Sequence, residues 1–98
     1  MFALLRRLFG PAEAPPAREW VAEGATLLDV RSAREFAGGH LEGAMNVPHT
    51  EIAARLAEIP EGRVVVYCKS GMRSALAARQ LRAAGYEVLD IQRASRFR

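Results

Sequence analysis

The chain has only one cysteine and two histidines among its 98 residues. A single cysteine excludes a disulfide bond within the chain and is typical of proteins from a reducing compartment. Cys68, His40 and His49 also lack the short, repeated spacing of metal ligands. The sequence therefore predicts neither a disulfide framework nor a metal site.

Long hydrophobic runs are also missing. The most apolar stretch is residues 1–10, and two adjacent arginines interrupt it. This segment is too short for a membrane span or for the apolar part of a secretory signal, so we predict a cytoplasmic protein. Its apolar residues recur at helical spacing, which leaves contact with a membrane surface or a partner as an alternative to a self-packed terminal turn. We prefer the self-packed turn.

Charge of one sign is not concentrated anywhere in the sequence. The formal net charge is +3, the calculated pI is about 9.8, and the arginines are scattered among glutamates. No basic stripe interleaved with aromatic residues is present, so we predict no binding of nucleic acid.

The length allows a single domain. Pro11, Pro15 and Pro16 mark an extended linker, so we assign residues 1–16 to an N-terminal segment with a proline-rich linker and residues 17–98 to the domain. Strand and helix patterns alternate along this domain. We expect strands at 26–30, 44–47, 64–68 and 85–91, and helices at 18–23, 33–37, 51–58 with Thr50 as its cap, and 74–84. Such alternation predicts an α/β fold with a parallel sheet.

The segment Val64–Ser74 is the most informative part of the chain. Its three valines are typical of a strand buried on both faces, and the strand ends at Cys68. Gly71 can adopt the positive φ of a sharp turn before the next helix. Because ligands of such sheets bind at the carboxyl ends of the strands, we expect Cys68 to lie near Asp29 and Arg31 at this edge.

The expected position of Cys68 favours a reactive thiol. Backbone N–H groups of residues 69–73 have no acceptor within the helix and carry the positive end of its dipole. Together with Lys69 and Arg73, they predict that the pKa of Cys68 lies below the usual value of about 8.5. The alternative is that Cys68 is a small buried hydrophobic residue.

Two motifs occur in an order that matches a known family. The first comprises Leu28–Arg31, Glu35–Phe36, Gly39–Leu41, Gly43–Ala44 and Asn46–Pro48, and the second comprises Val66–Ser74, with Gly85–Tyr86 after the following helix. Over residues 26–91 the chain resembles the single-domain rhodaneses, which are sulfurtransferases. The resemblance implies a three-layer α/β rhodanese-like domain, in which helices flank a mainly parallel central sheet of four to five strands.

The same resemblance implies catalysis through a persulfide. Cys68 would attack the sulfane sulfur of a donor such as thiosulfate, hold it as Cys–S–S⁻ and pass it to a thiophilic acceptor. The implied partners are a small anionic sulfur donor and an acceptor that is a thiol, cyanide or a protein. The reaction requires no metal and no organic cofactor. Converging backbone N–H groups would stabilise the anionic persulfide.

The loop after Cys68 supplies the other residues that the resemblance implicates. Ser70, Gly71 and Met72 would contribute mainly backbone N–H groups, and Met72 would also line the mouth of the pocket. Lys69 and Arg73 would attract an anionic donor. Arg73 would also orient the loop, or it would instead pair with a carboxylate beneath the loop.

Three residues of the first motif are assigned supporting roles. Asp29 and Arg31 would hold loops through charge-assisted hydrogen bonds, which we prefer to direct contact with the substrate. We interpret His40 as a hydrogen-bonded structural histidine rather than a general base, because a thiolate needs no base to remove its proton.

The two ends of the chain depart from the family pattern. Many rhodaneses follow the last strand with a Gly-Gly turn and a helix that contains tryptophan, whereas this chain ends a few residues after that strand, at Arg98. We therefore expect one wall of the pocket to be short. No strand is predicted before Trp20, so one edge strand of the family sheet is either lost or formed by residues 13–16.

Two other functions are compatible with a rhodanese-like fold. Cysteine phosphatases and arsenate reductases use a loop one residue longer than the four residues between Cys68 and Arg73. A shorter ring of N–H groups suits one sulfur atom better than a tetrahedral phosphate. Another alternative is a non-catalytic binding module, against which the presence of Cys68 argues. A physiological role in relaying sulfur to a protein partner stays open.

Overall fold

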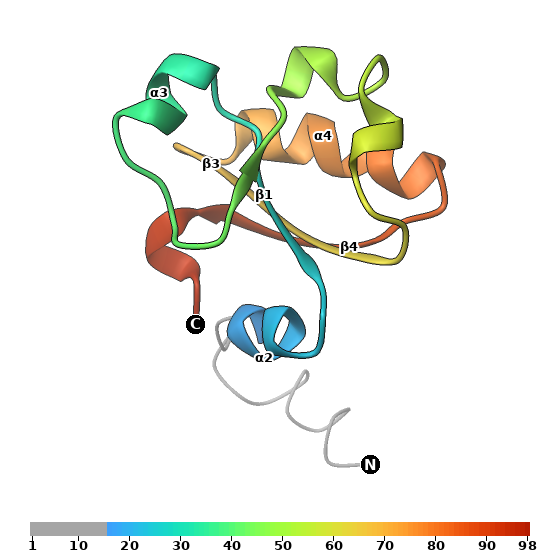
Figure 1. Cartoon of the computed structure of the whole chain (residues 1–98), viewed down its shortest axis with the longest axis horizontal. Coiled ribbons are helices and arrows are strands. Elements are labelled where there is room, and N and C mark those ends of the chain that lie inside the picture. The colour runs from blue at the N-terminus through green and yellow to red at the C-terminus, as the bar shows by residue number, and fades with distance from the viewer. Residues whose placement is uncertain (1–15) are drawn as a thin grey trace.

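The computed structural model describes residues 16–98, so segment 1–10 and most of the linker lie outside the described residues. The chain forms, in order, α2 (Ala17–Ala22), β1 (Thr26–Asp29), α3 (Ala33–Ala37), β2 (Met45–Asn46), η1 (His49–Glu51), η2 (Leu56–Glu58), β3 (Arg63–Cys68), α4 (Met72–Ala83), β4 (Glu87–Arg93) and η3 (Ala94–Arg96) (Figure 1). No helix within residues 16–98 is both long enough and apolar enough to cross a membrane.

The four strands form one parallel sheet in the order β2-β1-β3-β4. The valine-rich β3 lies between β1 and β4, and its residues from Val64 to Cys68 are buried. A strand with packed neighbours on both sides and both faces needs apolar residues at successive positions, which explains the run of three valines. The predicted α/β fold with a parallel sheet is confirmed.

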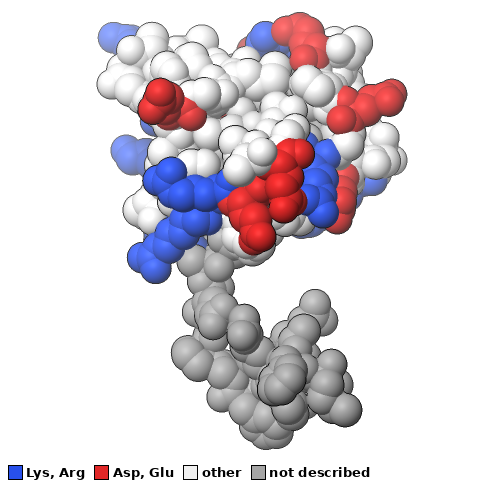
Figure 2. Space-filling model, turned by 60° about the horizontal axis from the view of Figure 1, so that its bottom comes forward, with Lys and Arg blue, Asp and Glu red and all other residues white. Residues whose placement is uncertain are grey.

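Helices cover both faces of the sheet, which gives three layers. On one face α4 packs through Ala77, Ala78 and Leu81 against β1 and β3. On the other face α2 packs through Ala17 against a cluster that contains Leu27, Val65, Tyr67 and Ile91. Figure 1 shows α4 and α2 on opposite sides of the strands, as the predicted three-layer arrangement requires. The face in Figure 2 carries acidic and basic side chains next to each other.

The predicted helix 51–58 with Thr50 as its cap is wrong. The structure has two separate short 3₁₀ turns, η1 and η2, and Thr50 lies inside the first, which follows Pro48 without a side-chain cap. A helix of this length is marginal on its own, so tertiary contacts decide its conformation. Here the Tyr86 hydroxyl donates its proton to the Ile59 carbonyl oxygen at 2.7 Å and also lies 3.3 Å from the Leu56 carbonyl oxygen, both at the second turn.

The last strand begins and ends two residues later than the predicted range 85–91, and it contains a β-bulge. Tyr67 pairs with Gln92 and Val66 with Asp90, so Ile91 is the extra residue. Gln92 has a φ of 72°, and its backbone N–H donates to Asp90 Oδ1 at 2.9 Å. Bulges change the direction in which a strand presents its side chains. Beyond this bulge, the end of β4 and η3 lie beside the carboxyl end of β3.

Candidate active site

Cys68 lies at the carboxyl end of β3, where the chain turns into α4. Gly71 makes this turn with a φ of 116°, a conformation that side chains with a Cβ rarely adopt. The turn brings two amides to the sulfur: the N–H of Gly71 donates to Sγ at 3.0 Å, and that of Ser74 donates at 3.4 Å. The predicted convergence of amides on Cys68 is confirmed for Gly71, and the second amide, from Ser74, lies one residue beyond the predicted range 69–73.

These donors determine the acidity of the thiol. Burial raises the pKa of Cys68, but hydrogen bonds from Ser74, Gly71 and Ser70 outweigh burial and bring this pKa below its usual value. The Ser74 hydroxyl also donates to the Gly71 carbonyl at 3.0 Å, and its one proton serves only one acceptor at a time. The backbone amides are therefore the constant contribution to the lowered pKa of Cys68, whereas the Ser74 hydroxyl contributes only when it does not bind the Gly71 carbonyl. The pKa of Cys68 is shifted downwards, as predicted. Hydrogen bonds are the main cause of this lowering, and the charges of Lys69 and Arg73 are not.

The sulfur is reached through a cavity. Cys68 is only 2% exposed, yet it lines an open cavity of about 470 Å³. The lining residues come from four parts of the chain: Arg31 after β1, Gly39, His40 and Leu41 after α3, Tyr67, Cys68 and Lys69 at the end of β3, and Arg93, Ala94 and Ser95 at the end of β4. Cys68 is thus buried among protein atoms but is not sealed from a small ligand.

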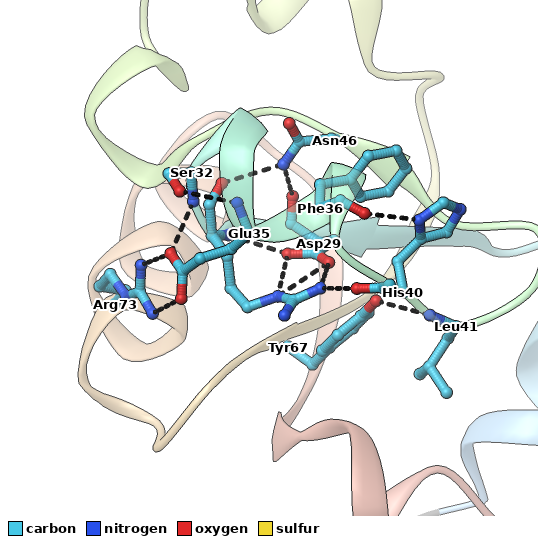
Figure 3. Close-up of polar contacts among 11 residues, drawn as sticks. Asp29, Ser32, Glu35, Phe36, His40, Leu41, Asn46, Tyr67 and Arg73 are labelled. Carbon is cyan, nitrogen blue, oxygen red and sulfur yellow. Dashed lines mark hydrogen bonds and ion pairs between the residues drawn. The ribbon is translucent and has the colours of Figure 1, made fainter.

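Arg73 is not among the residues that line this cavity, and its side chain joins α4 to α3. Its guanidinium donates to both carboxylate oxygens of Glu35, at 2.6 and 3.1 Å (Figure 3). Hydrogen bonds from Arg73 and from the Ser32 backbone lower the pKa of Glu35 to about 2. Glu35 also completes the predicted capping box with Ser32. The geometry matches the alternative in which Arg73 pairs with a carboxylate beneath the loop.

Asp29 and Arg31 form a second ion pair at the end of β1. The Asp29 carboxylate is buried and accepts hydrogen bonds from the Arg31 backbone N–H, Nε and Nη2, the last at 2.6 Å. Arg31 Nη2 also donates to the Gly39 carbonyl at 2.7 Å. Asn46 Nδ2 donates to the carbonyl oxygens of Asp29 and Arg31, which fixes the loop between β1 and α3. The pair thus holds one wall of the cavity in place.

His40 and Tyr67 fix the segment between α3 and β2. His40 Nδ1 donates to the Phe36 carbonyl at 2.9 Å, and the two rings stack with centroids 3.7 Å apart (Figure 3). The buried Tyr67 hydroxyl accepts a hydrogen bond from the Leu41 backbone N–H at 3.0 Å. Burial raises the pKa of Tyr67 to about 12, so the phenol remains protonated at neutral pH.

The structure corrects one expectation about the cavity and identifies the residues of one of its walls. Met72 does not line its mouth, because the side chain is 78% exposed and lies outside the set of lining residues. The wall expected to be short is formed by residues 93–95. Arg93 was not among the predicted site residues, because the β-bulge that aligns it with Cys68 has no clear signal in the sequence.

The charged residues that line the cavity are all cationic. They are Arg31, Lys69 and Arg93, and no aspartate or glutamate in the described part of the chain lines it. Residues 16–98 also contain no cluster of three or more side chains suited to bind a metal ion. The site therefore combines one acidic thiol, two directed amides and a positively charged rim, an arrangement suited to an anionic sulfur compound.

A family model described as the rhodanese-like domain matches residues 13–93. The chain belongs to the rhodanese-like domain family. A sulfurtransferase of Allochromatium vinosum is 42% identical to this rhodanese-like domain over 72 residues, which cover 71% of this chain and 67% of that protein. The thiosulfate:glutathione sulfurtransferase of Homo sapiens is 34% identical over 88 residues, covering 74% of this chain and 76% of that protein.

Solved structures support the same assignment. A crystal structure of a rhodanese homologue from Thermus thermophilus is 28% identical, with a TM-score of 0.63, over 76% of this chain and 84% of that chain. Some curated relatives are longer, and this chain spans only 49% and 29% of two of them. Together these similarities confirm the predicted family and fold, and they support sulfurtransferase activity in general.

Replacement of Glu35 by glutamine tests the link between α3 and α4. Glutamine can still complete the capping box but carries no charge for Arg73. The pKa of Glu35 is lower in the folded state than in the unfolded state. The ion pair with Arg73 therefore stabilises the fold fully at pH values above the unfolded pKa of Glu35, and this stabilisation is lost as pH falls towards 2. We expect Glu35→Gln to be less stable than wild type in urea at neutral pH, with the difference vanishing between about pH 4.5 and 2. A difference that does not change with pH would contradict the ion pair.

Replacement of Gly71 by alanine tests the turn that directs its amide at Cys68. Both Gly71 and the control position Gly85 have positive φ, so alanine at either should cost about 1–2 kcal/mol of unfolding free energy. A Cβ at Gly71 would also lie 3.3 Å from the Gln92 Cβ, whereas one at Gly85 meets nothing within 4 Å. We expect Gly71→Ala to be the less stable variant and the only one with slower alkylation of Cys68 by iodoacetamide at neutral pH. Equal alkylation rates in the two variants would refute this role of the turn.

Proposed function

We propose that this domain moves sulfane sulfur from a small anionic donor such as thiosulfate to a thiophilic acceptor through a persulfide on Cys68. The observation that carries the proposal is the pair of amides, from Gly71 and Ser74, directed at Sγ within a cavity rimmed by cations. Similarity to a human thiosulfate:glutathione sulfurtransferase supports the choice of thiosulfate as donor and of a thiol as acceptor.

In the first step the Cys68 thiolate attacks the outer sulfur of thiosulfate. A bond forms between Sγ and that sulfur, the sulfur–sulfur bond of thiosulfate breaks, and its electron pair leaves with sulfite. The enzyme is left as Cys–S–S⁻. Both thiosulfate and sulfite are dianions, so Lys69 at the cavity wall favours entry of the donor.

In the second step an acceptor attacks the outer sulfur of the persulfide. The bond to Sγ breaks and its electron pair returns to Cys68, which regenerates the thiolate. The amides that lower the pKa of Cys68 stabilise this leaving thiolate. The same amides thus act in both steps, because Sγ loses its negative charge in the first step and regains it in the second.

A protein acceptor is the second candidate. A relative of Bacillus subtilis, 33% identical over 66 residues, is named a putative sulfur carrier protein, and this chain covers 36% of it. In that case the persulfide of Cys68 would form as above and would be delivered to a protein thiol rather than to a small molecule. A sulfur-relay module of this kind uses the same cavity and the same first step.

Intact-mass measurement after incubation with thiosulfate tests the proposal. We expect wild-type protein to gain one sulfur atom and to lose it on addition of cyanide, which accepts sulfur as thiocyanate. The near-isosteric variant Cys68→Ser should gain none, because a hydroxyl does not form the persulfide. If thiosulfate, polysulfide and mercaptopyruvate all fail to add sulfur to the wild-type protein, the domain is not a sulfurtransferase and the non-catalytic binding module is the better interpretation.

A further inference from the structure

The cavity beside Cys68 is larger than a single sulfur donor requires. Its volume of about 470 Å³ falls in the range of roughly 300–1,000 Å³ that is typical of pockets for organic ligands. Thiosulfate has only five heavy atoms and would leave most of this space empty. The remaining space extends towards Leu41, Ala94 and Ser95, which line the cavity together with Cys68. An organic molecule that carries a thiol can therefore occupy the cavity while its sulfur reaches Cys68.

The cations around Cys68 differ in how much of their charge is available to a ligand. Arg31 is paired with the buried carboxylate of Asp29 at 2.6 Å, and Arg73 is paired with Glu35 at the same distance. Within residues 16–98, Lys69 and Arg93 pair with no carboxylate. A ligand in this cavity therefore experiences the positive charge of Lys69 and Arg93 much more than that of Arg31 or Arg73.

Arg93 is placed next to Cys68 by the sheet itself. The two residues are register partners at the ends of β3 and β4, and neighbouring strands lie about 4.7–4.9 Å apart. The β-bulge at Ile91 establishes this register, since without the extra residue Gln92 would be the partner of Cys68. Arg93 is exposed and lines the cavity, so it can meet a ligand without breaking an existing ion pair.

We propose that Arg93 is a specificity-determining residue, which binds a carboxylate of an acidic organic thiol that accepts sulfur from Cys68. This inference rests on the proposed function and adds the chemical class of the acceptor. The acceptor thiolate RS⁻ attacks the outer sulfur of Cys–S–S⁻, the bond to Sγ breaks, and RS–S⁻ leaves while Cys68 regains its thiolate. Because both reactants are anions, Lys69 and Arg93 reduce their repulsion, and Arg93 adds a contact that only an acidic acceptor can make.

A single-turnover experiment with a charge series of thiols tests this assignment. Cys68 is loaded with thiosulfate to completion, excess donor is removed, and loss of the persulfide is followed by intact mass. The acceptors are mercaptosuccinate, 3-mercaptopropionate, neutral 2-mercaptoethanol and cationic cysteamine. The readout is the preference, defined as the rate constant with mercaptosuccinate divided by that with 2-mercaptoethanol. Intrinsic differences between the thiols cancel when this preference is compared between variants.

We expect Arg93→Gln to lower the preference about five- to fifteenfold, as estimated for one unit charge about 7 Å from the ligand at a dielectric constant of roughly 30–50. Arg93→Lys should retain most of it. The control Arg79→Gln removes the same charge from an exposed position on α4 outside the cavity and should leave the preference unchanged. Complete loading of each variant with sulfur shows that it is folded.

The outcomes separate this inference from the proposed function. Loading of wild type followed by an unchanged preference in Arg93→Gln overturns the assignment of Arg93 and leaves the sulfurtransferase proposal intact. An equal decrease in Arg79→Gln overturns the assignment as well, since it would reflect net charge alone. If the wild-type protein does not load with any sulfur donor, the proposed function fails, and this inference fails with it.

Discussion

The structure depends on one constraint: the Cys68 sulfur must lie where the first amides of α4 point. This position requires a buried parallel strand that ends at Cys68 and a turn tight enough to start a helix at Met72. Gly71 makes the turn possible, and its own N–H is one of the two amides that reach Sγ. The same geometry that connects β3 to α4 therefore creates the anion site, so the fold and the chemistry cannot be separated at this point.

Two ion pairs keep this geometry fixed without neutralising the cavity. Glu35 binds Arg73 beneath the loop, and Asp29 binds Arg31 beside it, so these two guanidinium groups each have a structural partner. Charge that would otherwise attract a donor is used to join α3 to α4 and to hold the loop after β1. Anions are then attracted mainly by Lys69, which directly follows β3, and by Arg93, the last residue of the neighbouring β4. Support and recognition are thus assigned to different cations.

The sequence was informative where local chemistry determines the structure. The valine run, Gly71 and the Ser32–Glu35 capping box each act within a few residues, and all three were predicted and confirmed.

Features that depend on partners distant in the sequence were missed. Residues 51–58 have a helical pattern, but they contribute to two separate 3₁₀ turns, and Tyr86 binds the carbonyl of Ile59 at the end of the second turn. Arg93 reaches the cavity only because a bulge shifts the register of β4. The sequence could not show whether Arg73 attracts the anionic sulfur donor or pairs with a carboxylate such as that of Glu35, since both roles require only a cation.

The acidity of Cys68 is the central claim, and titration of this thiol tests it most directly. The rate of alkylation by iodoacetamide as a function of pH reports the fraction of thiolate in the folded wild-type protein. We expect a midpoint below the usual value of about 8.5 for a cysteine thiol, because hydrogen bonds from Ser74, Gly71 and Ser70 outweigh the effect of burial. A midpoint at or above that value would mean that the amides do not stabilise the thiolate, and it would contradict the account.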